Sequence, residues 1–483
     1  MTGAVLRGSE LATRLRAAPV VASAARSVPV DGWIVGGAVR DAALGRPVRD
    51  VDLAVDGSPR EVAKALAGEG GGHAFELSRE FETWRAVERR GGWQVDVTPL
   101  RGAGIESDLA LRDFTVGAIA VPLREGEPID PHGGLDDLEA RVVRAVGERS
   151  FADDPIRLLR AARLGADLDA EIEPRTMAHG RAEAGRAGEP AGERRLAELR
   201  NLLATDDPLR GLALLDQLGV TPFLLPEVEA MKGVEQNPNH HLDVHGHTLA
   251  VLDRLLEVEE NLERYAGPRA PEVADLLVES LADGMTRRDA LRFGALLHDI
   301  GKPATRQEIG GRVTFIGHDE VGAEMVGDLC RRLRASRRLT RHLQSLTRNH
   351  LRLGFMVNER PLPARRVYDY LRATEPAEVD VTLLTVADRL AARGQGPTAT
   401  DEMIQGHLEL AREMIAAGLD WRREGPPAPL VRGEQLAAAL GIPPGPQIGR
   451  MLSEIEAAQY AGEVTSEEEA IALARRSSTA GSL

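Results

Sequence analysis

The chain has 483 residues, of which 43% are hydrophobic and 28% are charged, an ordinary composition for a globular protein with several domains. Its single cysteine, Cys330, excludes an internal disulfide framework and a cysteine-rich zinc fold, and it predicts a cytoplasmic location. The formal net charge of −15 argues against indiscriminate coating of nucleic acid. No apolar run approaches the ~20 residues that span a bilayer, so we expect no membrane partner.

The hydrophobic patterns, taken in chain order, predict an α+β protein. Residues 1–30 are expected to form a helical extension. Residues 31–146 alternate short strands and helices, which predicts a mixed sheet with strands near 32–35, 51–55, 73–78, 84–89 and 93–98, the last two joined at Gly91-Gly92. Beyond Asp153 helical patterns dominate, apart from a hairpin expected at 305–316. We divide this helical remainder into 147–230, 231–395 and 396–483.

Two glycines, Gly36 and Gly37, separate a predicted strand from a predicted helix. Glycine lets backbone amides approach a ligand closely, and the start of a helix carries a partial positive charge that favours phosphate. The pair is therefore a candidate phosphate-binding turn. The same pattern also makes an ordinary tight turn, so it carries little weight alone.

Asp50 and Asp52 are two residues apart on a predicted strand, so their side chains share one face. Adjacent carboxylates repel each other, a divalent cation removes that cost, and hard oxygen ligands favour Mg²⁺. Asp96 lies in a third apolar strand. Three carboxylates on neighbouring strands would hold two metal ions, which activate an attacking hydroxyl and stabilise a leaving pyrophosphate. The alternative is an exposed strand face with solvated acids.

Five motifs follow one another between residues 36 and 164: GGAVRDAALG (36–45), RDVDLAV (49–55), LRDFTVGAIA (111–120), IDPHGGLDDL (129–138) and DDPIRLLRAARL (153–164). Together they resemble the class II tRNA nucleotidyltransferases and bacterial poly(A) polymerases of the DNA-polymerase-β superfamily. The resemblance implies an N-terminal mixed-sheet nucleotidyltransferase head at 31–146 and a helical neck for RNA and base selection at 147–230. It also implies a helical C-terminal tail at 396–483 that binds tRNA.

The resemblance implies roles for single residues as well. In the family, the carboxylates that match Asp50 and Asp52 bind catalytic Mg²⁺. Contacts with the nucleotide, mainly its triphosphate, are implied for Gly36, Gly37, Arg40, Arg112, Arg160 and Arg163. Selection of the base is implied for Asp154 and Arg157. Departures from the family's motifs leave the balance between CTP and ATP open; they are Leu111, Gly117, Asp153 and Leu164.

The selecting pair makes physical sense. Cytosine and adenine both present an amino donor beside a ring-nitrogen acceptor, so a carboxylate such as Asp154 can accept while a guanidinium such as Arg157 donates. Uracil and guanine present the reverse order and would leave buried charges unpaired, at a cost of about 1–3 kcal/mol each. The spacing of three residues predicts that both side chains share one helix face. An ordinary helical ion pair is the alternative.

A second set of residues combines imidazole and carboxylate groups spread over several predicted helices, which suits a divalent metal ion. The pattern includes HTLAVL (247–252) and ALLHDIGKP (295–303), and it resembles the HD phosphohydrolase superfamily. This resemblance implies an HD domain at 231–395 with phosphatase or phosphodiesterase activity. The ligands it implies are His247, His298, Asp299 and Asp388, with His318 and His350 for a second metal. His342 is expected at the surface.

Residues 331–352 contain eight arginines and no acidic residue. Arg331, Arg334, Arg338 and Arg341 recur at helical spacing, which predicts one basic stripe that binds RNA phosphates. A solvated arginine-rich face is the alternative.

The resulting prediction is an RNA 3′-end nucleotidyltransferase that adds C, A or both to tRNA from CTP and ATP. An A-only enzyme, a CC-only enzyme and a poly(A) polymerase share these motifs and stay open as alternatives. A chain whose main activity is HD hydrolysis is a further alternative. The metal of the HD site and the oligomeric state are not predicted.

Overall fold

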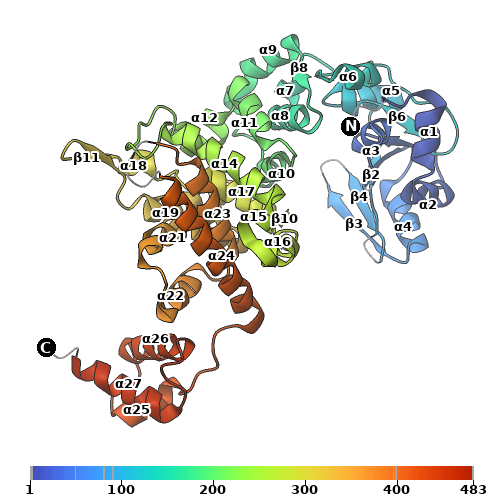
Figure 1. Cartoon of the computed structure of the whole chain (residues 1–483). Helices are drawn as coiled ribbons and strands as arrows, with labels where there is room; N and C mark the ends of the chain where they lie inside the picture. The colour runs from blue at the N-terminus through green and yellow to red at the C-terminus, as the bar shows by residue number, and fades with distance from the viewer. Residues whose placement is uncertain are drawn as a thin grey trace. The chain divides into compact units, whose positions relative to one another are not determined.

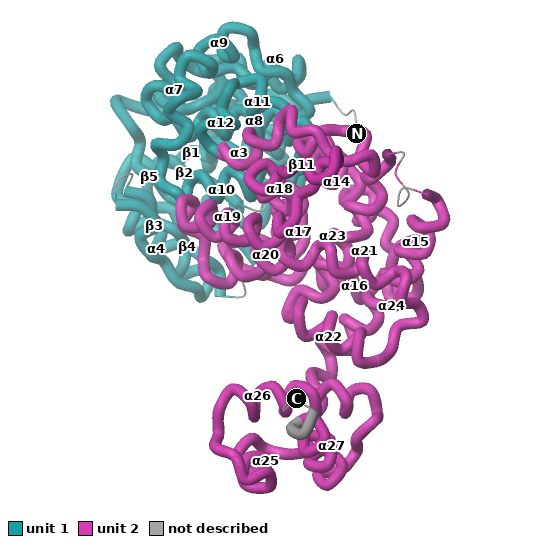
Figure 2. Tube along the Cα trace, turned by 90° about the vertical axis from the view of Figure 1, so that its left-hand side faces the viewer, with its two compact units in different colours: residues 1–224 teal, residues 225–483 magenta. Residues whose placement is uncertain are grey.

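The computed structural model describes residues 4–48, 50–79, 82–89, 92–394, 396 and 400–480. The backbone forms two compact units, Met1–Leu224 and Leu225–Leu483, which Figure 2 colours separately. The first unit contains a mixed sheet followed by helices, and the second is almost entirely helical. The predicted α+β class, with an N-terminal sheet domain and a helical remainder, is confirmed.

The first unit is built on a six-stranded sheet with the order β3-β4-β5-β2-β1-β6. Strands β2 and β5 are parallel, and all other neighbours are antiparallel. Figure 1 shows this sheet in blue, with β3 at one edge. The predicted strands agree with the structure to within a few residues, although Gly91 of the predicted turn lies outside the described residues. The strands are β1 (Gly32–Val35), β2 (Asp50–Val55), β3 (His73–Ser78), β4 (Thr83–Val87), β5 (Gln94–Pro99) and β6 (Ala120–Pro122).

The two faces of the sheet differ in what covers them. Helix α4 (Pro59–Glu69) begins where Ser58 Oγ accepts a hydrogen bond from the Glu61 amide, and it packs against β3, β4 and β5. Buried residues such as Val97 lie on this face. Trp84, which pairs with Val97 across the strands, shows that this is the face toward α4, because the Arg60 guanidinium of α4 lies 5.6 Å from the centre of the Trp84 ring. Alternate strand residues, including the predicted catalytic aspartates, therefore point to the opposite face.

The helical part of the first unit presents a row of arginines. Helix α8 (Arg157–Asp167) packs against α10 and α11 and buries Leu158, Leu159 and Ala162, while the arginines at three-residue spacing lie on a less buried side. This part also contains one parallel strand pair, β7 with β8, so it is not purely helical. The remaining elements of this unit are α1 (Gly8–Arg16), α2 (Pro19–Ser27), α3 (Gly37–Ala43), α5 (Ile105–Ala110), η1 (Thr115–Gly117), α6 (Gly134–Ala140), β7 (Val142–Val143), α7 (Ser150–Asp153), β8 (Glu171–Ile172), α9 (Pro174–Glu183), η2 (Ala184–Arg186), α10 (Gly192–Leu203), α11 (Pro208–Gln217) and α12 (Thr221–Leu224).

The second unit is organised around helix α23 (Glu378–Ala391), which is buried along most of its length and packs against α14, α17, α20 and α24. The predicted hairpin at 305–316 is confirmed by β11 and β12. The other elements are α13 (Pro226–Glu229), α14 (Val244–Glu260), α15 (Leu262–Ala266), η3 (Gly267–Arg269), α16 (Ala270–Leu277), β9 (Ser280–Ala282), β10 (Met285–Thr286), α17 (Arg287–Leu297), α18 (Lys302–Thr305), β11 (Gln307–Ile309), β12 (Arg312–Thr314), α19 (His318–Arg332), α20 (Arg337–Asn349), α21 (Arg352–Met356), η4 (Val357–Glu359), α22 (Ala364–Thr374) and α24 (Asp401–Glu424).

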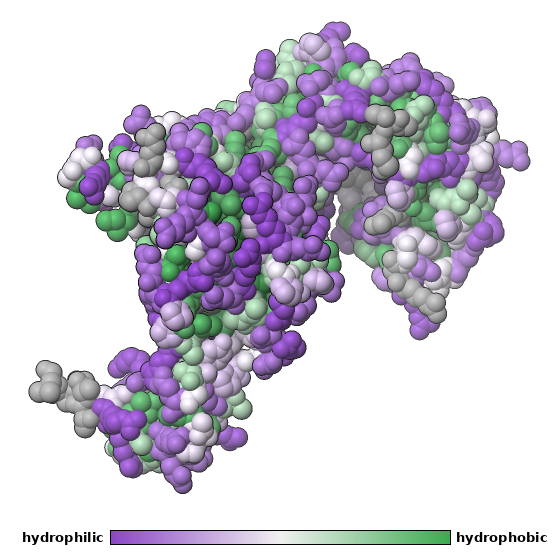
Figure 3. All heavy atoms as spheres, in the orientation of Figure 1, coloured by the Kyte–Doolittle hydropathy of each residue, from purple (hydrophilic) through white to green (hydrophobic). Residues whose placement is uncertain are grey.

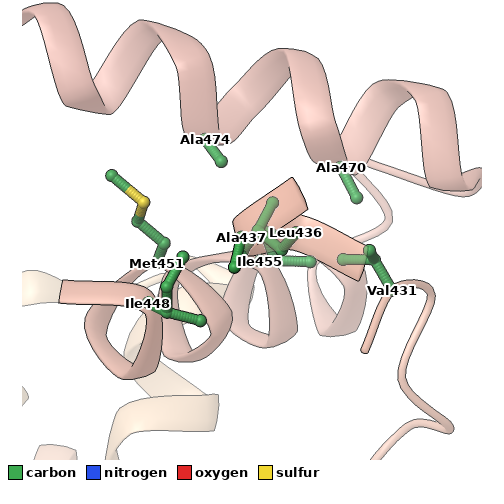
Figure 4. Close-up of a cluster of buried hydrophobic side chains, with 8 residues drawn as sticks. All are labelled: Val431, Leu436, Ala437, Ile448, Met451, Ile455, Ala470 and Ala474. Carbon is green, nitrogen blue, oxygen red and sulfur yellow. The ribbon is translucent and has the colours of Figure 1, made fainter. Parts of the chain in front are cut away.

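The last three helices surround a hydrophobic core of their own, shown in Figure 4. They are α25 (Gly433–Leu440), α26 (Pro446–Tyr460) and α27 (Glu467–Ala480). The Tyr368 hydroxyl of α22 donates to Glu456 at 2.7 Å, which joins this small bundle to the rest of the unit. The core residues are Val431, Leu436, Ala437, Ile448, Met451, Ile455, Ala470 and Ala474.

A charged cluster lies at the centre of the second unit. The Arg287 guanidinium forms two hydrogen bonds with Asp380, and the side chains are only 4% and 0% exposed. His342 Nε2 lies 3.6 Å from Asp380 Oδ1 and is buried, so the expectation that His342 lies at the surface is wrong. The physical reason is its helix face, because His342 shares the face of α20 that carries the buried Leu339 and Leu346.

Glu378, at the start of α23, makes this cluster sensitive to pH. It is 1% exposed, and burial raises its pKa from 4.5 to about 7, although its own backbone amide and Arg422 favour the charged form. The folded state therefore keeps a proton that the unfolded chain releases, and stability falls as the pH rises from 4.5 through 7. We expect Glu378→Gln to raise the free energy of unfolding by roughly 3 kcal/mol at pH 8 and to change it little below pH 4.5.

Urea unfolding at the two pH values measures this difference. Glu375→Gln is the matched control, because the Glu375 side chain is 39% exposed. A gain in stability that is equal at both pH values would contradict the expectation.

Candidate active sites

The predicted catalytic aspartates lie on the sheet face opposite α4. Asp50 and Asp52 occupy the first and third positions of β2, so they share a face as predicted. Asp96 is the direct neighbour of Asp52 in the parallel β2–β5 pairing. Its carboxylate is held by Arg85 of β4, with Nε–Oδ1 and Nη2–Oδ2 distances of 2.6 and 2.7 Å. Asp96 is thus in place beside Asp52, but a guanidinium already neutralises it.

The Asp52 carboxylate is the most perturbed acid of this site. Surrounding protein atoms limit its hydration, and this effect, together with repulsion from Asp96 and Asp50, raises its pKa to about 6 although Arg112 opposes the shift. The side chain still reaches solvent. A carboxylate that is accessible and repelled by two others is stabilised by a bound cation, so the donor set fits a divalent metal ion.

Gly36 forms the turn before α3, and the site depends on its lack of a side chain. Its φ of +71° lies in the region that favours glycine, and a Cβ atom there would lie 3.1 Å from Asp52 Oδ2 and 3.4 Å from Arg112 Nη1. The backbone of the turn therefore lies directly against the aspartate and the arginine. Arg112 is itself oriented by Asp108, which is 2% exposed and lies 3.1 Å from Nη2 of Arg112.

The segment 111–113 connects this aspartate site with helix α8. The Leu111 carbonyl accepts a hydrogen bond from Arg157 at 3.0 Å, and the Asp113 carboxylate accepts one from Arg160 at 2.6 Å. Arg112 lies between these two residues in the chain and faces Gly36. The predicted nucleotide-binding arginines of the strand domain and of α8 therefore converge on one place within the first unit.

Two arginines of α8 share one acidic partner. Glu198 of α10 accepts from Arg160 Nε at 3.0 Å and from Arg163 Nε at 2.8 Å, and its side chain is 10% exposed. Arg163 also borders an open pocket of about 300 Å³ together with Arg40, whose guanidinium pairs with Asp41. The pocket is lined by Arg40, Asp41, Arg46, Arg163, Asp167, Asn201, Ala204 and Thr205.

The predicted base-selecting pair is placed differently from the expectation. Asp154 has an extended backbone (φ −148°, ψ 99°) and precedes α8, so it does not share a helix face with Arg157. The physical reason is Pro155, because a proline disfavours the helical conformation of the residue before it. Asp154 pairs with Arg194 of α10 at 2.6 Å, whereas Arg157 donates to Ser150 Oγ at 3.0 Å.

Sequence reasoning missed the partners that hold the predicted residues in place. All of them are charged residues close to a predicted element. The position of Asp113 directly after Arg112 in a motif could have indicated that it belongs to the site. Nothing in the spacing alone identified the others. These partners are Arg85, Asp108, Asp113, Arg194 and Glu198.

The second unit assembles the predicted HD ligands into two groups of three. In each group, the ligand atoms lie within 4.8 Å of one another. The first group comes from α14, the end of α17 and α23, and the second comes from the residue after His298, α19 and the end of α20. The groups are His247, His298 and Asp388, and Asp299, His318 and His350. Within the described residues, no other such group of His, Cys, Asp and Glu is present, so Asp50, Asp52 and Asp96 are less closely gathered.

The histidines of this site are oriented for metal binding. Nδ1 of His298, His318 and His350 lies 2.6–2.8 Å from a backbone carbonyl three residues earlier, which places the proton on Nδ1 and leaves Nε2 as a lone-pair donor. Nε2 of His318 then faces Nε2 of His350 at 3.3 Å. Two lone pairs that face each other repel, and a cation between them removes the repulsion.

Asp299 belongs to the second group and also lies beside His298 of the first. Its Oδ1 lies 3.3 Å from His318 Nε2, and its Oδ2 lies 3.1 Å from His298 Nε2 and 2.7 Å from Lys302 Nζ. Among the described residues, neither carboxylate oxygen has a hydrogen-bond partner of good geometry. These buried, unsatisfied atoms fit a metal ion.

The predicted basic stripe is not one helical face. Arg331 lies in the last turn of α19, where it pairs with Asp328 at 2.8 Å. Arg338 and Arg341 lie on the next helix, α20. Arg334 lies in the turn between the helices with a positive φ of 54°. The turn forms because Ser336 caps α20 through the Leu339 amide. All four arginines are exposed, but the single stripe is wrong.

Comparison with known proteins agrees with this geometry. Residues 32–144 match the poly A polymerase head domain, 170–232 match the probable RNA and SrmB-binding site of polymerase A, and 244–393 match the HD domain. The chain is 38% identical to the A-adding tRNA nucleotidyltransferase of Deinococcus radiodurans, with 93% of this chain and 96% of the relative covered. The chain belongs to the tRNA nucleotidyltransferase family.

Other members of the family are similar over most of their length. The CC-adding tRNA nucleotidyltransferase of Thermus thermophilus is 32% identical, with 92% of each chain covered. A CCA-adding enzyme of Thermotoga maritima solved with tRNA shares the fold with a TM-score of 0.55 at 23% identity, covering 98% of this chain and 99% of that one. A CCA-adding enzyme solved with ATP gives 0.60 at 22% identity, with the same coverage. Among the described residues, no helix combines the length and apolarity needed to cross a bilayer.

Proposed function

We propose that this nucleotidyltransferase adds C, A or both to the 3′ end of tRNA from CTP and ATP. The observation that carries the proposal is the series of contacts from Asp52 through Gly36 and Arg112 to Arg157 and Arg160. It gathers a metal-binding carboxylate, arginines that suit a triphosphate, and the candidate base-selecting arginine in one unit. The relatives named for A addition and CC addition support the same reaction class.

In this proposal Asp50 and Asp52, with Asp96 beside them, hold Mg²⁺. The bound ions supply activation of the RNA 3′-hydroxyl and neutralise charge on the leaving pyrophosphate. The glycines at 36 and 37 leave room for phosphate close to the backbone. Charge-assisted hydrogen bonds to the triphosphate come from Arg40, Arg112, Arg160 and Arg163.

Asp154 and Arg157 select the base in the proposal. The Asp154 carboxylate accepts from the exocyclic amino group of cytosine or adenine, and the Arg157 guanidinium donates to the adjacent ring nitrogen. Arg194 orients the Asp154 carboxylate through a hydrogen bond from Nη2 to Oδ2 at 2.6 Å. This arrangement accepts both C and A, and it disfavours U and G.

The test is stepwise incorporation on tRNAs that end before the first C, after one C and after two C residues. Each tRNA is incubated with one labelled nucleoside triphosphate. We expect C on the first two ends, A on the third, or one of these partial sets, and no incorporation of U or G. Repeated addition of A would indicate a poly(A) polymerase. Failure to extend any of these ends, or equal use of all four nucleotides, would refute the proposal.

We further propose that the HD domain, at 231–395, is a metal-dependent phosphohydrolase. The observation that supports this proposal is the pair of ligand groups, which adjoin each other where Asp299 of the second group lies 3.1 Å from His298 Nε2 of the first. A divalent ion there would be bound by His247, His298, Asp299 and Asp388, with His318 and His350 for a second ion, and the bound ions would supply an activated water. Lys302, whose ammonium lies beside Asp299, is the candidate phosphate contact.

The proposal keeps the domain boundaries predicted from the sequence. They are a helical extension at 1–30, the head at 31–146, the neck at 147–230 and the tail at 396–483. The arginines at 331, 334, 338 and 341 and the tail bind the tRNA body. We place the enzyme in the cytoplasm.

Chelation should destabilise the second unit selectively. After treatment with EDTA, addition of Mn²⁺ or Ni²⁺ at about 100 times its dissociation constant should raise a thermal unfolding midpoint by roughly 5–10 °C, because the ion binds only the folded ligand set. Differential scanning calorimetry of the full chain measures the shift.

The matched variants are His298→Gln and His407→Gln. His407 is buried on α24 and lies outside both ligand groups, with its Nε2 3.2 Å from Thr385 Oγ1. We expect the His298 variant to lose the metal-induced shift and the His407 variant to keep it. A shift that survives in the His298 variant would argue against the site.

A further inference from the structure

Two rows of side chains cross the sheet face that carries the aspartates. Residues that pair directly across strands share a face, so the β3–β4–β5–β2 register aligns Phe75, Arg85, Asp96 and Asp52 in one row. The neighbouring row contains His73, Val87, Gln94 and Asp50. The aspartate site therefore continues along one face to the edge strand β3, which Figure 1 shows at the border of the sheet.

The outer end of these rows is an exposed aromatic pair. Phe75 is 41% exposed, and its ring stacks on His73 with a centroid distance of 5.8 Å and an interplanar angle of 21°. On the face of β3 toward α4 lie Ala74 and Glu76, which precede a register shift between Glu76 and Ser78. The large aromatic ring of this strand thus faces solvent, while hydrophilic residues predominate on the surface seen in Figure 3. Packing within this unit does not explain why an aromatic residue occupies the exposed position 75.

The direction of the reaction points to the same edge. Gly36 and Arg112 lie on the β1 side of Asp52, and the arginines of α8 join them there. In an in-line displacement, the attacking hydroxyl approaches from the side opposite the leaving pyrophosphate. With the triphosphate on the β1 side, the RNA end comes over β5, β4 and β3.

The surface between the aspartates and the aromatic pair is compatible with RNA. Arg85 neutralises Asp96 through two hydrogen bonds, so the backbone of the RNA meets no unpaired carboxylate at Asp96. Phe75 lies three strand spacings from Asp52, about 14 Å, which a short single-stranded end can bridge.

We propose that His73 and Phe75 form a stacking platform for a base near the 3′ end of the RNA, upstream of the nucleotide that is extended. The proposal rests on the RNA 3′-end transferase function proposed above. Stacking on an aromatic ring accepts every base, because each base has a π-face, so one platform serves RNA ends of different sequence. It holds the strand in register while Asp50 and Asp52 act on the terminal hydroxyl.

The first experiment replaces Phe75 and measures steady-state addition of a single nucleotide to tRNA. We expect Phe75→Ala to raise KM for tRNA by roughly 5- to 100-fold, to leave KM for the nucleoside triphosphate unchanged, and to leave the thermal midpoint unchanged. Phe75→Tyr should behave as the wild type, whereas Phe75→Leu, which keeps apolar bulk without an aromatic face, should resemble the alanine variant. Glu76→Gln, on the opposite face of β3, is the matched control.

The second experiment removes single bases from the RNA. tRNAs with one abasic nucleotide at each of the last few positions are compared with the wild type and with Phe75→Ala. We expect one position at which loss of the base raises KM for the wild type but not for the variant, because the variant has already lost that contact. Equal KM values for wild type and Phe75→Ala, or a Leu variant equal to wild type, would overturn the platform while leaving tRNA extension by the wild type, and hence the proposed function, intact. Absence of extension by the wild type would instead refute the proposed function.

Discussion

Replacement of Asp52 by asparagine is expected to lower the rate of nucleotide addition by roughly 1,000-fold or more. Asp52 lies against Gly36, beside Asp96, and shares a face with Asp50, so it is the carboxylate on which the proposed metal site depends. An amide keeps the size of the side chain but removes the negative charge that binds a divalent ion. Single-turnover addition to tRNA at saturating nucleotide measures the loss.

The control for this variant is Asp56→Asn, an exposed residue just beyond the opposite end of β2. It makes the same chemical change and should keep full activity. In the absence of divalent ions, Asp52→Asn should be at least as stable as the wild type, because it removes repulsion with Asp96 and Asp50. Retention of more than about a tenth of the wild-type rate would contradict the role of Asp52.

Loss of one partner of the Arg287–Asp380 pair should destabilise the second unit by about 3–5 kcal/mol. Both side chains are buried, and Arg287 also donates to the Pro376 carbonyl at 2.9 Å. Asp380→Asn leaves the guanidinium as an uncompensated buried charge, which is the costly outcome. Urea unfolding followed by the fluorescence of Trp421, which lies in the same unit, measures the change.

Two comparisons show whether the charge is responsible. The double variant Arg287→Met/Asp380→Leu removes both charges and should lose much less stability than either single change. Arg372→Met breaks an exposed ion pair with Glu375, whose side chains are 44% and 39% exposed, and should cost under about 1 kcal/mol. If Asp380→Asn costs no more than Arg372→Met, the buried pair does not stabilise the unit.

The sheet could be predicted from sequence because its pattern is local. Alternation in β2 places Val51 and Leu53 on one face and the aspartates on the other, and this period of two identifies both the strand and its active face. The order of strands and the pairing of Arg85 with Asp96 could not be predicted in this way. They depend on contacts between strands that no local pattern specifies.

The HD ligands could be named from the resemblance, but not their arrangement. The sequence offered no reason for the backbone carbonyls that orient His298, His318 and His350. Two local signals were available and were overlooked: Pro155 excludes a helical Asp154, and Ser336 marks a new helix within the arginine-rich segment. The burial of His342 depends on tertiary packing against Asp380.

Glu198 has a consequence for how the neck meets its substrate. Because one carboxylate holds both Arg160 and Arg163, these long side chains are ordered before any nucleotide arrives. A free arginine loses about 2 kcal/mol of rotamer entropy when it is immobilised. Arg160 and Arg163 lose this entropy when the protein folds, and therefore not when a ligand binds. In the proposed function, the outer nitrogens of this preorganised pair engage phosphate with little further ordering, which favours fast capture of each successive nucleotide.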